Sequence, residues 1–90
     1  MNRTVLVQRL RRSFDGEDRD FRVVARMAGD LSDSGAYAAD QGHELGVHEV
    51  VGHLESAPSG DVVERWNWWV GALEVAYGGY ERFAIRAREP

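Results

Sequence analysis

Three histidines lie close together in the stretch HELGVHEVVGH, which spans residues 43–53. Histidine is the commonest metal ligand and transfers protons near neutral pH, so this stretch is the first place to look for metal chemistry. Successive histidines are five residues apart. On a regular helix such side chains point ~140° apart, whereas a zinc pair on one helix prefers a spacing of four. His48 and His53, each four residues after a glutamate, are therefore weak candidates, and we predict no metal site and no cofactor.

The pattern HExxxH occurs twice in the same stretch. It resembles the zinc motif of the dipeptidyl peptidase III family, whose two histidines and a distant glutamate bind a catalytic zinc. The resemblance covers six residues, and we do not extend the activity of that family to this chain. The nucleotide-binding patterns GxxxxGK and GxGxxG and the nucleophile elbow GxSxG do not occur, and there is no cysteine. We therefore expect no enzymatic activity.

The run Trp66-Asn67-Trp68-Trp69 is better suited to recognition than to catalysis. Helical spacing places an apolar stripe on one side of this segment, which predicts a core-facing surface. The stripe consists of Trp66, Trp69, Val70, Leu73, Tyr77 and Tyr80. Trp68 lies ~160° from Trp66, on a second arc with Ala72, Val75 and Gly79. Because tryptophan is enriched at interface hot spots and small residues allow close helix approach, this arc predicts either a helix packed on both sides or a protein interaction face.

The arginines near the N-terminus are the third group with a chemical role to consider. All 11 basic residues are arginine; residues 1–28 carry a net charge of +3 and residues 29–90 a net charge of −7. A basic patch of this kind displaces counterions from nucleic acid. The residues that could form it are Arg9, Arg12, Arg19, Arg22 and Arg26. Asp18 and Asp20 dilute the patch and the isoelectric point is about 5.3, so nucleic-acid binding is an alternative that we do not favour.

Four helices are expected to carry these groups, over residues 4–14, 18–28, 33–56 and about 60–77. The apolar residues in each range recur with the helical period of 3.6 residues. Gly29 is expected to follow the end of the second helix. The glycines of the long third range, Gly42, Gly46 and Gly52, are expected to mark a kink or close helix contacts.

The periodicity favours an all-α bundle of about four helices, with the C-terminal tryptophan-rich helix as its spine. The alternative is an α+β fold with a three-stranded antiparallel sheet and two helices, because residues 4–10, 21–27 and 80–86 contain β-branched or aromatic residues. Whether residues 3–14 and 80–88 are helix or strand stays open at this point. Ninety residues are expected to form one small globular domain over residues 1–90.

These observations together favour a small, non-catalytic protein-binding protein, such as an accessory, adaptor or inhibitor protein. Its expected partner is another protein or a second copy of itself. The alternatives are a nucleic-acid-associated regulator that uses the N-terminal arginines and a metal-binding protein that uses His48, His53 and nearby acids. No segment reaches 18 uninterrupted apolar residues, so we expect no membrane partner and a cytoplasmic location.

Overall fold

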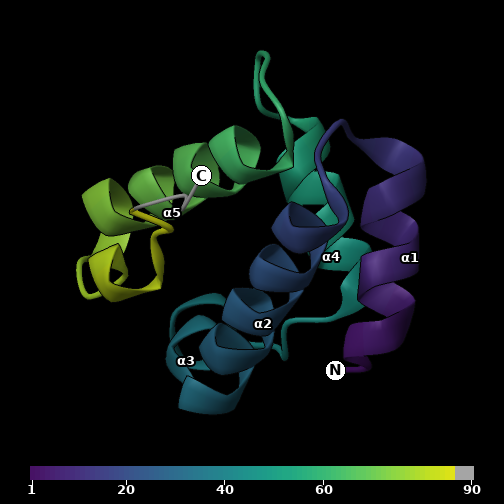
Figure 1. Ribbon diagram of the computed structural model, residues 1–90. Helices are drawn as coiled ribbons and strands as arrows, with labels where there is room; N and C mark the ends of the chain where they lie inside the picture. The colour runs from purple at the N-terminus through teal and green to yellow at the C-terminus, as the bar shows by residue number, and fades with distance from the viewer. Residues whose placement is uncertain (87–90) are drawn as a thin grey trace.

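The computed structural model describes residues 1–86 and is built from helices (Figure 1). The elements are α1 (Arg3–Ser13), α2 (Asp18–Ser34), α3 (Ala36–Gln41), α4 (Val47–Glu55), α5 (Val62–Tyr77) and the short 3-10 helix η1 (Glu81–Phe83). Helices α1 and α2 pack side by side, α4 contacts both α1 and α5, and α5 contacts α2 and η1. No strand is present in this part of the chain, so the all-α prediction is confirmed and the sheet alternative is wrong. In particular, residues 21–27 lie inside α2.

The first two helices begin where short polar side chains bind free backbone N–H groups. The side chain of Asn2 accepts a hydrogen bond of 3.0 Å from the Val5 amide at the start of α1. Asp20, a buried acidic residue near the start of α2, accepts a hydrogen bond of 3.1 Å from the Glu17 amide. These caps explain why the acidic loop before α2 is followed directly by a helix.

Helix α2 is longer than expected, because it continues through Gly29 to Ser34. It ends at Gly35, whose φ of 79° is the left-handed conformation that glycine adopts without strain. Leu31, in the added part, is fully buried. Burial of this side chain stabilises the extra turns and outweighs the unfavourable helix propensity of Gly29.

The long third helix expected over residues 33–56 is wrong, since the structure divides it into α3 and α4. Gly42, with φ of 82°, ends α3, and Gly46 precedes α4. The Glu49 carboxylate accepts a hydrogen bond of 2.8 Å from the Gly46 amide and caps α4. Gly52 lies inside α4 and does not mark a close helix contact, because a Cβ there would have no neighbour within 4 Å.

Helix α5 begins after the reciprocal cap formed by Asp61 and Glu64, in which each side chain accepts a 3.0 Å hydrogen bond from the other residue's amide. The chain then reverses at Gly78 and Gly79, which have φ of 79° and 87°. We call residues 78–86 the tail; it folds back along α5 (Figure 1).

The apolar stripe expected on α5 is correct for its first four members and wrong for Tyr77. The side chain of Tyr77 is 51% exposed, whereas Tyr80, after the reversal, is fully buried. The Tyr80 hydroxyl donates to the Asp40 carboxylate at 2.6 Å and so ties the tail to the end of α3. Burial and then the Asp40 carboxylate raise the pKa of Tyr80 above its ordinary value.

One continuous hydrophobic core receives side chains from all five α-helices and from η1. The largest fully buried side chain at its centre is Trp66. The part of the chain that the structure describes contains no helix long and apolar enough to cross a membrane.

Candidate functional site

The four residues of the Trp-Asn-Trp-Trp run point in different directions from the middle of α5. Trp66 points into the core, and its indole Nε1–H donates a 2.9 Å hydrogen bond to the backbone carbonyl of Phe83 in the tail. Its polar atom is therefore satisfied within a buried site. Trp66 fills the core and also holds the tail in place.

Asn67 holds the tail through two hydrogen bonds to a single residue, Ile85. The Asn67 side-chain amide donates to the Ile85 carbonyl at 2.8 Å, and its oxygen accepts from the Ile85 amide at 2.8 Å. The side chain thus pairs with the backbone of an extended segment as a neighbouring strand would. We call this arrangement the Asn67 clamp; the sequence gives no local sign of it, because its partner lies 18 residues away.

A third contact from α5 fixes the start of the tail. The Glu74 carboxylate accepts hydrogen bonds of 2.8 Å from the amides of both Tyr80 and Glu81. The Glu81 and Tyr80 amides lower the pKa of Glu74, because they stabilise its charged form. Trp66, Asn67 and Glu74 therefore all hold the tail against α5 through hydrogen bonds to its backbone.

Trp69 packs inward against the histidine segment. Its ring stacks on that of His53, with centroids 4.6 Å apart and an angle of 12° between planes. The Tyr37 hydroxyl lies 3.4 Å from His53 Nε2. Burial lowers the pKa of His53; the Glu49 carboxylate opposes this shift and His43 adds to it.

Among residues 1–86, which include the three histidines, no group of three or more His, Cys, Asp or Glu residues is arranged to hold a metal ion. His48 is exposed, while His53 is half-buried against Trp69. His43 is exposed, and its Nδ1 lies 3.1 Å from the Glu44 carbonyl oxygen. It lies in the loop between α3 and α4, outside both helices.

Trp68 lies on the opposite side of α5 and is 44% exposed. The residues predicted to share its arc, Ala72, Val75 and Gly79, are all exposed, and Val75 is exposed to 90%. Gly71 and Ala76 lie beside them and are exposed as well. We call the five residues Trp68, Gly71, Ala72, Val75 and Ala76 the α5 face; Gly79 lies in the chain reversal after the end of α5 at Tyr77 and so outside this helix. The alternative of a helix packed on both sides is therefore wrong.

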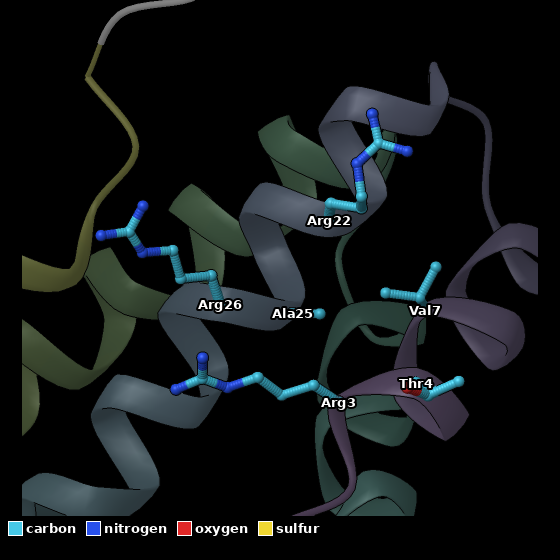
Figure 2. A pocket seen from close by; sticks show the side chains of 6 residues that line it. All are labelled: Arg3, Thr4, Val7, Arg22, Ala25 and Arg26. Atoms are coloured by element: carbon cyan, nitrogen blue, oxygen red, sulfur yellow. The ribbon is translucent and has the colours of Figure 1, made fainter.

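Two of the five predicted arginines line a groove between α1 and α2, together with one that the sequence analysis missed. Arg22 and Arg26 on α2 and Arg3 on α1 line a groove of about 290 Å³; the guanidinium groups of Arg3 and Arg26 lie on one side, whereas that of Arg22 points away from them (Figure 2). Arg12 lines a separate hollow with Gln8 and Arg11, while Arg9 is half-buried and Arg19 is exposed. Arg3 was missed because its contacts with α2 are 27 residues distant in sequence and leave no local pattern.

The model of the WNWW domain family matches residues 1–74. The matched range covers the Trp-Asn-Trp-Trp run at residues 66–69, whose one-letter code is the name of the domain, and it ends before the tail. No curated protein and no solved structure matches this chain. Because the family model covers most of the sequence, the chain belongs to the WNWW domain family.

Proposed function

We propose that this chain is a small, non-catalytic protein-binding module and that the α5 face is its contact surface. The observation that carries the proposal is the exposure of Trp68 and Val75 on an otherwise small-residue surface. A soluble protein rarely presents a contiguous apolar patch unless the patch binds something. Tryptophan in such a patch is a typical hot-spot anchor.

The neighbours of Trp68 support a role in association rather than in folding. Trp66, Asn67 and Trp69 each contact the core, the tail or His53, as described above. Trp68 makes no side-chain hydrogen bond or ring contact within residues 1–86. A large apolar side chain without such a role is free to bind a partner.

We take a second copy of the chain as the partner, because the shape of the α5 face is complementary to itself. The large side chain, Trp68, lies at one end of the face, and the small residue Ala76 lies two turns further along. If two copies pack their α5 helices antiparallel about a two-fold axis near Ala72, Trp68 of each copy lies over Ala76 of the other. The contact is then self-complementary, as a two-fold interface requires, and the small residues let the helices approach closely.

The oligomeric state in solution tests this proposal. Mass determination by light scattering or sedimentation, over micromolar to millimolar concentration, is expected to show a dimer that Val75→Arg abolishes. Trp68→Ala is expected to weaken the dimer by roughly thirty-fold or more, because truncating a buried interface tryptophan typically costs about 2 kcal/mol. Both variants should keep the helical circular dichroism spectrum of the wild type.

Val5→Arg is the matched control, since Val5 is also an exposed valine on a helix, at 41% exposure on α1. It adds the same charge outside the α5 face and should leave dimerisation unchanged. A wild-type chain that stays monomeric at millimolar concentration would exclude the second copy as the partner. Equal effects of Val5→Arg and Val75→Arg would show that association does not use the α5 face.

A further inference from the structure

We propose that the groove between α1 and α2 binds a compact phosphate monoester through Arg3, Arg22 and Arg26. This site is separate from the α5 face, so it adds a ligand to the proposed protein-binding function. The groove has a volume of about 290 Å³ and lies at the packed junction of the two helices. Its size is close to the lower end of the range for small-molecule sites.

The two groove arginines on α2 have a placement that the fold does not explain. Arg22 and Arg26 are exposed, four residues apart, and therefore neighbours on one face of α2. Within residues 1–86 neither takes part in a salt bridge, a hydrogen bond or a cation–π contact. Two like charges at this spacing repel each other. An anion bound beside both guanidinium groups would attract each of them and so offset this repulsion.

Two other arginines of the chain make the contacts that are typical of a structural role. Arg65 donates to the carbonyls of Gly60 and Leu54 at 2.7 and 3.0 Å and also lies over the ring of Phe14. Arg11 pairs with Asp18 at 3.2 Å. Because Arg22 and Arg26 lack contacts of this kind, their guanidinium groups are available to a ligand.

The third arginine reaches the groove because α2 has a glycine where the two helices meet. Arg3 extends from α1 across α2, with its guanidinium on the same side as that of Arg26 (Figure 2). A Cβ at Gly29 would collide with the Arg3 guanidinium. Arg3 also pairs with the exposed Asp30 at 3.4 Å, a weak interaction that a better anion can replace.

The charge and the lining of the groove select a compact ligand. A phosphate monoester carries a charge of −1.5 to −2 at neutral pH and accepts hydrogen bonds from the planar guanidinium fork. The groove is also lined by the apolar side chains of Val7 on α1 and Ala25 on α2, which can contact the organic part of the ester (Figure 2). Asp18 and Asp30, paired with arginines of α1, would repel a longer polyanion. None of the lining residues is aromatic, as base stacking by a single-stranded nucleic acid would require.

Two-dimensional NMR of the isotope-labelled chain tests the proposal, with inorganic phosphate as the probe in a constant chloride background. Saturable shifts are expected for the amides of residues 3–7 and 22–26. Arg22→Ala with Arg26→Ala should weaken phosphate affinity about ten-fold or more, because two charge-assisted hydrogen-bonding groups are lost. Arg9→Ala with Arg12→Ala is the matched control, since it removes the same charge and should change the affinity less than about two-fold.

Further arms of the titration distinguish the sources of the phosphate group. A phosphoserine peptide and a nucleoside 5′-monophosphate should each compete with inorganic phosphate, and the tighter of the two identifies the source. Shifts that do not saturate, or equal loss in the two double variants, would overturn the proposal in favour of nonspecific attraction. Tighter binding of an oligonucleotide than of either monoester would overturn it in favour of nucleic-acid binding.

Discussion

The Asn67 clamp gives the sharpest test of how the tryptophan-rich helix holds the fold together. Asn67→Ala removes both 2.8 Å hydrogen bonds to Ile85. A hydrogen bond of this kind contributes roughly 0.5–1.5 kcal/mol, so the free energy of unfolding should fall by about 1–3 kcal/mol. For a chain of this length, 1 kcal/mol corresponds to a change in melting temperature of about 4–8 °C. The melting temperature should therefore fall by at least about 4 °C.

The same variant should loosen the tail before the rest of the protein unfolds. Burial of the Phe83 side chain contributes roughly 1.5–3 kcal/mol, which is comparable to the loss expected from Asn67→Ala. The tail should therefore open locally, and hydrogen exchange at the Ile85 amide should accelerate while exchange in α2 changes less. Arg86→Ala, which removes only an exposed pair with Glu81, is the control and should have little effect on either measurement.

Asn67→Asp tests the clamp through the direction in which stability changes with pH. A carboxylate at this position keeps the acceptor for the Ile85 amide but loses the donor to the Ile85 carbonyl, so the variant should be less stable than the wild type at pH 7. The protonated carboxyl can donate to that carbonyl, and its pKa in the folded state should exceed that in the unfolded state. The folded state then binds more protons, so the stability difference from the wild type should shrink as the pH falls through this folded-state pKa. Unchanged Ile85 exchange in Asn67→Ala, or a difference for Asn67→Asp that grows on acidification, would refute the clamp.

Two further predictions concern residues that the fold places in unusual surroundings. Gly29→Ala should leave stability unchanged or raise it by up to about 1 kcal/mol, because alanine favours the helix and the displaced Arg3 is flexible. Phosphate affinity should fall at the same time, and a lower melting temperature would show that α2 cannot accept the methyl group. Because burial lowers the pKa of His53, the unfolded state binds more protons than the folded state, so stability should decrease as the pH falls through about 6.5, the ordinary pKa of histidine. Thermal melts of His53→Phe should lose part of this dependence, whereas His48→Phe, at an exposed position, should retain it; equal behaviour of the two variants would contradict the assignment.

The sequence predicts the helical fold well where the apolar period is uninterrupted. In α5 the burial of Trp66 and Trp69 follows from the helical period, which also separates Trp68 from them; the period alone does not decide whether Trp68 is buried or exposed, and the structure shows it exposed. The prediction fails between α3 and α4, because Gly42 and Gly46, expected inside one long helix, instead end the first helix and precede the second. It fails at Gly29 for the opposite reason, since a glycine inside a helix has the same local signal as one that ends it.

The predicted surfaces differ in how much of their geometry the sequence could give. The α5 face lies on one helix, so the period alone brings Trp68 and Val75 together. The arginine groove lies between two helices, and its composition depends on how α1 and α2 pack. Local periodicity places Arg22 beside Arg26, but only the packing adds Arg3 and separates Arg12 from the groove.

The residues of the Trp-Asn-Trp-Trp run have different roles, which depend on whether each side chain contacts backbone atoms, core side chains or solvent. Trp66 and Asn67 bind the tail through backbone atoms of Phe83 and Ile85. Backbone groups are present whatever side chains the tail carries, so these contacts place little demand on the tail sequence. The match to the WNWW family ends at residue 74, before the tail. The backbone groups that Trp66 and Asn67 bind are nevertheless present in a tail of any sequence. Because the other three members contact the core and the tail, we expect substitution of Trp68 to leave the fold intact, and, if the proposed function holds, to weaken partner binding.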